Sequence, residues 1–525
     1  MSSQPNAPAP SALAPLERLI AGLSVCLFAI GAFARVFPFF QGGSRFLQRF
    51  PTEDGYLMLT IARNLAIGNG FSTAAGEIPT NGTQPLTTLI WSCFFALAGG
   101  EKELGVALVL LFQLALSGLT AWLCYRFFAR LLEGREHARS IALLTAAVCF
   151  ASPVALPHSM NCLETGAYGC IALLVAGVAI DTRAALTWRR STLFGVLLGL
   201  AFLVRNDAVF LIAGACLVQG FAPRADPRET LPRRLTRTTV TGLVSIAVAS
   251  PWLAFNYANF GHIVPVSGRA ESLTGKFASN LAEMPIIWLE YLLALVPIPI
   301  GVQHSVWMPY VATLLVLAAL ALLYRTWPRL RGPERRLAAL LGVFSGGLAV
   351  FYGLFFGAGW FLPRYFFPLA PWLMLPMCVL LVRVLARCAA PPLRCGVAFG
   401  ILALITGVNA RNQITQAEHP HFQVVRWVQA NVPERAWVGA VQTGTVGFFH
   451  DRTMNLDGKV NPDAYEALIQ RRLHEYVVAS PIEFLADWYP AMRDWMKSPV
   501  IASAFEVAHF DPEANVGALR RRTPR

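Results

Sequence analysis

Residues 16–37 read LERLIAGLSVCLFAIGAFARVF, a mainly apolar run long enough to cross the hydrocarbon core of a membrane, which takes ~20 such residues. The run is too long for the core of a signal peptide, and Arg35 stands near its far end, where a cleavage site needs small residues. Similar runs recur as far as about Ala410, too many to be buried helices of a water-soluble domain. The sequence therefore predicts a retained first span and an all-α polytopic membrane protein.

The composition supports the same prediction. Of the 525 residues, 55% are hydrophobic and only 14% are charged, whereas a soluble domain usually carries ~25% charged residues. The net charge is +13, but the arginines stand in short loops beside apolar runs, so no nucleic-acid partner is expected. The ten cysteines show neither a CxxC pair nor a Cys/His spacing, and no metal ligand is assigned among them.

About eleven spans are expected from hydropathy, at residues 16–38, 104–131, 141–157, 163–181, 192–204, 208–221, 239–257, 306–324, 336–357, 366–386 and 395–410. Residues 1–15 are expected to form a disordered cytoplasmic tail and residues 16–410 the transmembrane module. Residues 411–525 have a more ordinary composition, with an amphipathic helix expected over 422–430 and a strand over 437–441. They predict a small C-terminal α/β domain.

Loop charge predicts the topology. Basic residues follow every second span, as in Arg126, Arg130, Arg135 and Arg139 after the second one. The positive-inside rule then places the N-terminus in the cytoplasm, and the loop 39–103, the loop 258–305 and the C-terminal domain outside a bacterial inner (plasma) membrane. Merging the short spans 192–204 and 208–221 would reverse the downstream topology, but Arg205-Asn206-Asp207 between them favours a tight turn.

The loop 39–103 carries two adjacent carboxylates, Glu53 and Asp54, directly before a helical stretch at 56–67. A second apolar stretch at 85–97 is too short to span, and both stretches are expected to lie at the membrane interface. Asp is a favoured N-cap residue, so helix capping is the simpler explanation of Asp54 taken alone. Capping and catalysis do not exclude each other.

Other ionisable residues gather on the same predicted side of the membrane, where they are costly and therefore mark candidate sites. They are Glu164 at the start of the fourth span, Arg205 and Asp207 in the turn, Arg269 and Lys276 in the loop 258–305, and Arg364 at the mouth of the tenth span. Each one alone could stabilise a helix end or reach the lipid headgroups. Together they favour a functional site.

A carboxylate and several cations at a membrane surface suit the transfer of a group from a lipid phosphate. The carboxylate can deprotonate an acceptor hydroxyl, and arginine or lysine can stabilise the leaving phosphate. The guanidinium fork matches phosphate oxygens in geometry, while lysine acts as a point charge.

A series of motifs points to a family. Glu53-Asp54-Gly55-Tyr56, then Ala62-Arg63-Asn64 and Gly68-Asn69-Gly70, resembles the first outer loop of GT-C glycosyltransferases, and Asn81-Gly82-Thr83-Gln84-Pro85 is similar to the branch of the terminal β-arabinofuranosyltransferases. Further matches are Leu163-Glu164-Thr165, Val204-Arg205-Asn206-Asp207, residues 261–267, Pro363-Arg364-Tyr365, Thr445-Val446-Gly447-Phe448-Phe449 and residues 455–462. The resemblance covers most of the chain, and the order of the motifs is more specific than any one of them.

The resemblance implies transfer of a sugar, with inversion, from a polyprenyl-phosphate donor to a glycan, lipid-linked or protein acceptor. Asp54 takes the role of general base, because the family's acidic residue stands nine positions before the Arg of its Ala-Arg motif, as Asp54 does before Arg63. Glu53 stands where many relatives have Asp and is the second catalytic candidate. The branch suggests a pentofuranose such as arabinofuranose.

The remaining candidates follow from the same resemblance. Arg205, Arg364, Lys276 and Arg269 are expected to bind the donor phosphate, although Asn206 replaces the usual Pro in that turn. Glu164, Asp207, Tyr56, Asn81, Gln84, His262 and Asp457 are candidates for substrate binding. For Asp457, a turn that supports the small domain is an equal alternative. A divalent metal stays open as a cofactor, because family members differ and no ligand cluster is visible in the sequence.

The alternative function is a transporter or flippase of a lipid-linked sugar. Transporters often show inverted repeats and polar residues near the middle of the membrane. The sequence shows no such repeat, and its polar residues gather at one face. A scaffold without activity would leave that set of charges unexplained, so surface chemistry is favoured.

Overall fold

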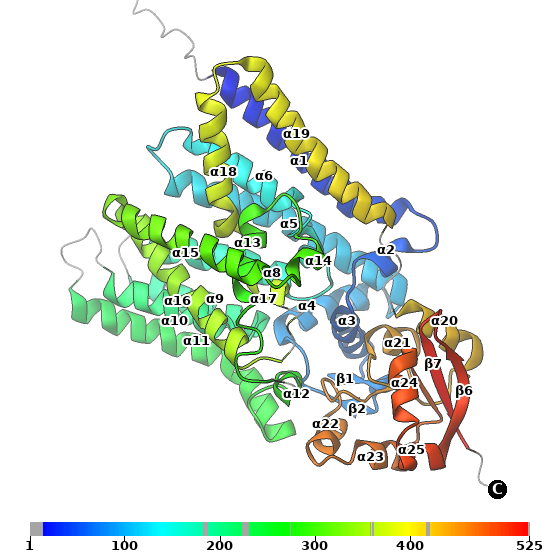
Figure 1. The fold of residues 1–525 in the computed structure, drawn as a ribbon. Coiled ribbons are helices and arrows are strands. Elements are labelled where there is room, and N and C mark those ends of the chain that lie inside the picture. Colours follow the sequence, from blue (N-terminus) through cyan, green and yellow to red (C-terminus); the bar gives the residue numbers. More distant parts are fainter. Residues whose placement is uncertain are drawn as a thin grey trace, which may run out of the picture.

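The computed structural model describes residues 14–181, 187–222, 230–273, 275–357, 359, 362–415 and 421–522. A body of long helices makes up most of the chain, and a small domain that contains a sheet lies against one end of it (Figure 1). Of the tail expected at residues 1–15, residues 1–13 lie outside the described part, and Ala14 and Pro15 begin the first helix.

Each of the eleven predicted spans coincides with a helix. These helices are α1 (Ala14–Phe40), α5 (Lys102–Leu131), α6 (Ala138–Ala151), α8 (Thr165–Ile180), α9 (Trp188–Val204), α10 (Ala208–Phe221), α11 (Leu231–Phe260), α15 (Met308–Thr326), α16 (Gly332–Leu354), α18 (Ala370–Arg387) and α19 (Pro391–Thr415). Among the described residues, seven helices are long and apolar enough to cross a membrane, while α6, α8 and α10 are shorter apolar helices. The helices are confirmed, and the number of crossings stays a prediction.

The helical body is built around α8, which is apolar and largely buried and packs against α5, α9, α10 and α16. A helix that is apolar on all sides is stable only when other helices surround it. The tight turn predicted at residues 205–207 is confirmed, because α9 ends at Val204 and α10 begins at Ala208. Arg205 and Asp207 are therefore fixed at the junction of two packed helices.

The loop 39–103 contains α2 (Arg45–Arg49), α3 (Glu53–Ala66), a short hairpin and α4 (Pro85–Leu97). The hairpin consists of β1 (Ser72–Thr73), the 3-10 turn η1 (Ala74–Gly76) and β2 (Ile78–Pro79). Both predicted helical stretches are confirmed, but the capping explanation of Asp54 is wrong. Thr52 is the N-cap, and its side chain accepts a hydrogen bond from the Gly55 N–H. Since Thr52 precedes both carboxylates, the helix begins early enough to carry Glu53 and Asp54 in its first turn.

The loop 258–305 and the segments near residue 364 also fold into short helices. They are α12 (Val266–Leu273), α13 (Met284–Leu293), α14 (Ile300–Gln303) and α17 (Leu362–Phe366). Three more short elements lie elsewhere in the body, namely α7 (Leu156–Ser159), η2 (Trp327–Arg329) and η4 (Phe367–Leu369). The sequence did not predict α13, which packs against α15 and α18. Its ten residues are too few for a span.

The C-terminal domain contains a five-stranded mixed sheet in the order β4-β3-β5-β7-β6. Its strands are β3 (Val438–Ala440), β4 (Thr453–Asn455), β5 (Phe484–Asp487), β6 (Phe505–Asp511) and β7 (Val516–Arg521). Its helices are α20 (Phe422–Asn431), α21 (Gly444–Phe449), α22 (Pro462–Ile469), α23 (Leu473–Ala479), α24 (Tyr489–Trp495) and α25 (Pro499–Ala504). β3 runs parallel to β4 and β5, and β7 runs antiparallel to its two neighbours. The predicted fold class is confirmed, including the helix at 422–430 and the strand at 437–441.

Close packing of α9 on α11 leads to a first prediction. A Cβ at Gly199 would lie 2.5 Å from the Cβ of Val248, so Gly199→Leu forces the helices apart. We expect a loss of about 1–3 kcal/mol, the usual cost of overpacking, measured as a lower melting temperature in detergent. Gly242→Leu on α11 is the control, because a Cβ there meets no atom within 4 Å. Equal destabilisation by both variants would contradict this packing.

Candidate active site

Asp54 lies at the centre of a cluster of charges where the helical body meets the C-terminal domain. Arg364 Nη1 from α17 lies 2.6 Å from Asp54 Oδ2, and Lys459 Nζ from the domain lies 3.7 Å from Asp54 Oδ1. Lys459 Nζ also lies 2.5 Å from Glu271 Oε1 of α12. Four separate segments thus supply two cations and two carboxylates to one cluster.

The cations keep Asp54 charged. Burial by itself opposes the charge, but attraction to Lys459 and Arg364, with their hydrogen bonds, lowers the pKa of Asp54 from 3.8 to about 2. Burial likewise opposes the charge of Lys459, yet Asp54, Asp457 and Glu271 together raise the pKa of that ammonium group. In this cluster Asp54 is therefore an ion-pair partner and a weak base.

Asp457 lies beside this cluster. Its Oδ1 accepts a hydrogen bond of 2.9 Å from the backbone N–H of Lys459, so it shapes the turn that presents the lysine. Burial raises the pKa of Asp457 from 3.8 to about 6, although Lys459 opposes the rise. The turn predicted for Asp457 is therefore confirmed, and its role in substrate binding stays a prediction.

A second, deeper cluster surrounds Arg205. Its guanidinium lies 2.7 Å from Asp207 Oδ2 and 3.7 Å from Glu164 Oε1, and all three side chains are buried. Tyr352 donates a hydrogen bond of 2.7 Å to the same Asp207 oxygen. Two carboxylates therefore balance the charge of Arg205.

The two clusters are connected through Arg364 and Tyr365. Arg205 Nη1 donates a hydrogen bond of 3.3 Å to the Arg364 carbonyl, and Arg364 donates one of 2.9 Å to the Tyr365 hydroxyl. The guanidinium carbons of Arg205 and Arg364 lie 4.6 and 4.9 Å from the centre of the Tyr365 ring. Arg205 thereby fixes the backbone and the aromatic ring that orient Arg364.

Glu53 points toward the C-terminal domain and away from the cations. Its carboxylate accepts hydrogen bonds from the backbone N–H groups of Gly444 and Thr445 and one of 2.8 Å from the Thr445 hydroxyl. A Cβ at Gly444 would lie 1.9 Å from the Glu53 carbonyl oxygen, so only glycine allows this approach. Glu53 joins the start of α3 to α21.

The contact with Glu53 continues into the core of the domain. His421 Nδ1 lies 2.8 Å from the Thr445 hydroxyl, and its Nε2 lies 3.2 Å from Asp487 Oδ1, with all three side chains buried. Burial by itself lowers the pKa of His421, but Asp487 and Glu53 outweigh burial and raise it. The position of the Glu53 carboxylate is thus coupled to the end of β5.

The other predicted residues lie around the cluster with different contacts. Tyr56 packs its ring against Phe448 of α21, and Asn81 accepts a hydrogen bond of 2.9 Å from the N–H of Val266, which starts α12. The Arg269 guanidinium stacks on the ring of Tyr465 in the domain, 4.6 Å from its centre. These contacts join the loops 39–103 and 258–305 to each other or to the C-terminal domain.

Three predicted residues do not join the cluster. Gln84 is the N-cap residue of α4, and its buried Oε1 has no hydrogen-bond partner within the described structure. His262 is exposed in the turn after α11, and Lys276 lies in the loop after α12 and forms no ion pair with any described residue. Lys459 and Glu271 were missed as site residues, although Lys459 belongs to a quoted motif.

The described residues contain no group of three or more His, Cys, Asp or Glu side chains that could hold a metal ion. A divalent metal therefore stays a prediction of the sequence resemblance alone. The cluster already supplies two protein cations, Arg364 and Lys459, that can balance a bound phosphate.

Glu53 leads to a prediction about docking of the domain. Glu53→Ala leaves the N–H groups of Gly444 and Thr445 without their acceptor, which costs about 1–3 kcal/mol when such groups are buried. We expect faster hydrogen exchange at these two amides, measured by mass spectrometry. Glu77→Ala, an exposed carboxylate of the same outer loop, is the control. Unchanged exchange in Glu53→Ala would contradict the coupling.

Asp457 leads to a prediction about pH. Because its pKa is raised from 3.8 to about 6, charging this carboxylate opposes folding, fully so above pH 6 and not at all below pH 4. Asp457→Asn should therefore be more stable than the natural protein at pH 7, by about 3 kcal/mol, and equal to it near pH 4. Melting temperatures measured across this range test the difference. A variant that is less stable at pH 7 would show that the charge is favourable.

A known family matches the C-terminal domain, whereas solved structures match the whole chain. The family described as "Domain of unknown function (DUF8728)" matches residues 408–514, which include the end of α19 and most of the C-terminal domain. No curated protein matches the sequence.

Solved structures are similar to the whole chain. ArnT from Cupriavidus metallidurans bound to undecaprenyl phosphate has a TM-score of 0.58 at 13% identity, over 97% of this chain and 98% of its own. The Archaeoglobus fulgidus oligosaccharyltransferase in complex with Zn and sulfate has a TM-score of 0.54 at 14% identity, over 94% and 72%. AglB from the same organism, in complex with an inhibitory peptide and a dolichol-phosphate, has a TM-score of 0.51 at 11% identity, over 98% and 75%. The expected resemblance is confirmed for the fold, and the chain has the fold of the GT-C superfamily.

Proposed function

We propose that the protein is a membrane glycosyltransferase that transfers a sugar from a polyprenyl-phosphate donor to an acceptor at the membrane surface. The observation that carries the proposal is the position of Asp54 between two cations, Arg364 and Lys459, at the junction of a GT-C helical body and a C-terminal domain. The similar ArnT and AglB structures contain undecaprenyl phosphate and dolichol-phosphate, which supports a donor of this class.

The charges of the cluster suggest how donor binding activates the base. A donor phosphate attracts Arg364 and Lys459, and the guanidinium can hold two of its oxygens. Each contact with phosphate takes a cation away from Asp54, whose pKa is now held at about 2 by these two groups. The pKa of Asp54 then rises toward that of an ordinary carboxylate, and its basicity increases only when the donor is in place.

In the proposed step, Asp54 accepts the proton of an acceptor hydroxyl as that oxygen attacks the anomeric carbon of the sugar. The bond between the anomeric carbon and the phosphate oxygen breaks, and the polyprenyl phosphate leaves with the electron pair. Attack from the side opposite the phosphate inverts the anomeric configuration. Arg364 and Lys459 stabilise the charge that develops on the phosphate.

Several predicted residues receive positioning roles. Glu53 holds the first turn of α3 against the domain, so we assign Asp54 as the base and Glu53 as its positioning residue. Arg205 is paired with Glu164 and Asp207, so we assign it to the support of Arg364 rather than to the phosphate. Lys459 replaces Lys276 and Arg269 as the second cation for the phosphate.

The finer identity of the reaction rests on the sequence resemblance. We propose a pentofuranose such as arabinofuranose as the sugar and a glycan, lipid-linked molecule or protein as the acceptor. The proposed location is a bacterial inner membrane, with the Asp54 cluster and the C-terminal domain outside the cytoplasm. A transporter or flippase is the other class that the experiment must separate.

The test is complementation of a deletion strain, followed by mass spectrometry of the cell-envelope glycans. The natural protein should restore a glycan that the deletion removes, and Asp54→Asn should lose at least about 100-fold in product, the usual contribution of a general base. Asp451→Asn is the matched control, because Asp451 also pairs with two cations at the same junction, Lys102 and Arg63.

A binding measurement accompanies the glycan measurement. Purified Asp54→Asn should bind undecaprenyl phosphate at least as tightly as the natural protein, because Arg364 and Lys459 lose a competing anion. Full activity of Asp54→Asn would remove Asp54 as the base, and an unchanged glycan profile in the deletion strain would exclude the proposed transfer. Accumulation of a lipid-linked sugar, with Asp54→Asn active, would identify a flippase.

A further inference from the structure

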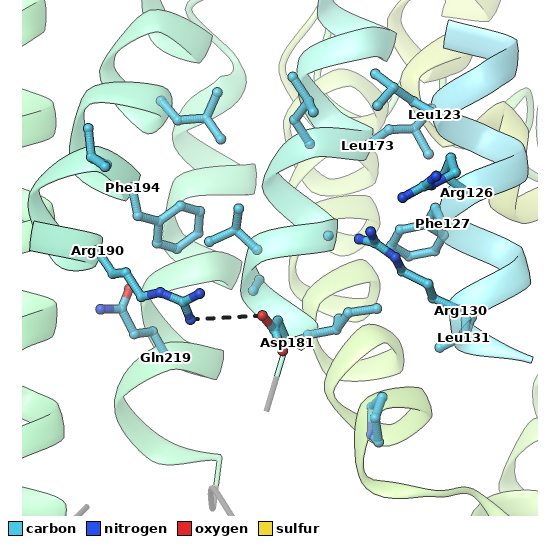
Figure 2. A pocket seen from close by; sticks show the side chains of 18 residues that line it. Leu123, Arg126, Phe127, Arg130, Leu131, Leu173, Asp181, Arg190, Phe194 and Gln219 are labelled. Carbon is cyan, nitrogen blue, oxygen red and sulfur yellow. Dashed lines mark ion pairs between the residues drawn. The ribbon is translucent and has the colours of Figure 1, made fainter. Parts of the chain in front are cut away.

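A groove opens in the helical body between α5 and α9, with α8 as its floor (Figure 2). Its volume is about 850 Å³, and most of its lining is apolar. The charged residues that line it are three arginines and one aspartate, namely Arg126, Arg130, Arg190 and Asp181. None of these residues belongs to the Asp54 cluster.

The groove lies at the end of α5 that is far from the active site. α5 begins at Lys102, whose ammonium group lies 2.9 Å from Asp451 of the C-terminal domain. Its 30 residues extend for about 45 Å at the helical rise, which exceeds the ~30 Å hydrocarbon core of a bilayer. If α5 crosses the bilayer as predicted, Arg126 and Arg130 in its last turns reach the lipid headgroups on the opposite surface.

The arginines enter the groove from two sides. Arg126 and Arg130 are four residues apart, so they lie on one face of α5, and both are exposed. Among the described residues neither of them forms an ion pair, whereas Arg190 on α9 lies 3.9 Å from Asp181. Figure 2 shows Arg126 and Arg130 reaching into the groove opposite Arg190. The lining carries an excess of two positive charges.

The floor of the groove offers apolar surface that the protein does not cover. Leu174 and Val178 of α8 are 38% and 44% exposed, and Leu193 of α9 is 58% exposed. Gly177 between the first two leaves room, because a Cβ there would meet only the Phe127 ring, at 4.0 Å. These two features indicate the class of ligand. Free phosphate would leave the apolar floor uncovered, and a zwitterionic lipid would bring next to its phosphate a cationic group that the arginines repel.

We propose that this groove is a specific binding site for an anionic phospholipid. The lipid phosphate binds Arg126 and Arg130, and an acyl chain lies along Gly177 between α5 and α9. Bound lipid fills the space between two helices that the protein alone leaves apart, and it stabilises the helical body from the surface opposite the active site. The lipid site does not depend on the proposed sugar transfer.

The test is a lipid titration of the purified full-length protein by native mass spectrometry, with phosphatidylglycerol and phosphatidylcholine of identical chains. The natural protein should bind phosphatidylglycerol about tenfold more tightly, and Arg126→Gln with Arg130→Gln should remove this preference. Arg325→Gln with Arg329→Gln is the matched control, because both arginines are exposed and neither lines the groove. They also lie near the same end of α5, since the neighbouring Arg331 donates a hydrogen bond to the Leu131 carbonyl.

A second pair of variants tests the acyl-chain site. Gly177→Leu fills the floor and should weaken binding of both lipids, whereas Gly118→Leu, on an exposed and open face of α5, should not. Melting temperatures in lipid-free detergent check that each variant is folded. Equal affinity of the natural protein for both lipids, or unchanged binding in the arginine or Gly177 variants, would overturn the proposal. Displacement of phosphatidylglycerol by millimolar inorganic phosphate would overturn it in favour of free phosphate.

Discussion

The pairing of Asp54 with Arg364 and Lys459 is the interaction on which the junction of the helical body and the C-terminal domain depends. The side chains of Asp54 and Arg364 are only 16% and 15% exposed, so each charge needs its partner. Since the partners come from α3, α17 and the domain, no one of these segments can be charge-balanced alone. Gly82 allows the turn with Lys459 to lie close to the loop 39–103, because a Cβ there would lie 2.1 Å from the Lys459 carbonyl oxygen.

Two adjacent carboxylates have separate roles because they stand in the first turn of a helix. Neighbouring residues of an α-helix point about 100° apart, so Glu53 and Asp54 cannot face the same partner. Glu53 faces the start of α21, and Asp54 faces the cations. The structural residue thereby fixes the orientation of the residue that we propose as the base. Glu53 is coupled in turn to His421 through Thr445, so the core of the domain contributes to this orientation.

The parts of the structure that follow a local rule could be predicted from the sequence. A bilayer sets the length of an apolar run, and each expected span coincides with a helix. The turn at Arg205 and the strand near Val438 follow from local residue patterns in the same way. α13 was not predicted because its ten mainly apolar residues are too few to span a membrane and lack the polar face of a helix in a soluble protein. Asp54 was taken as a possible cap because the rule for caps does not choose between Asp54 and the preceding Thr52.

The partners of Asp54 were harder to predict because they are distant along the chain. Arg364 stands 310 positions after Asp54. Loop charge placed both residues on one side of the membrane, but no local pattern predicted that their side chains pair. Lys459 stands in a motif whose alternatives, a turn or a binding loop, the sequence left open. Glu271 belongs to no motif, and it reaches the cluster only because α12 packs beside the lysine. Pairing across such distances depends on the packing of whole helices, which local patterns do not encode.

The cations at the two ends of the helical body differ in whether they are paired with carboxylates. At the end that carries the Asp54 cluster, Asp54 and Glu271 accompany Arg364 and Lys459, whereas at the groove end Arg126 and Arg130 form no ion pair with any described residue. A membrane offers phosphates in great excess, so unpaired cations at its surface attract any anionic headgroup. Carboxylates that already occupy the cations weaken this attraction, because a phosphate must displace them. The carboxylates of the Asp54 cluster therefore favour a ligand that gains binding energy from contacts beyond its phosphate, as we propose for the sugar of the donor.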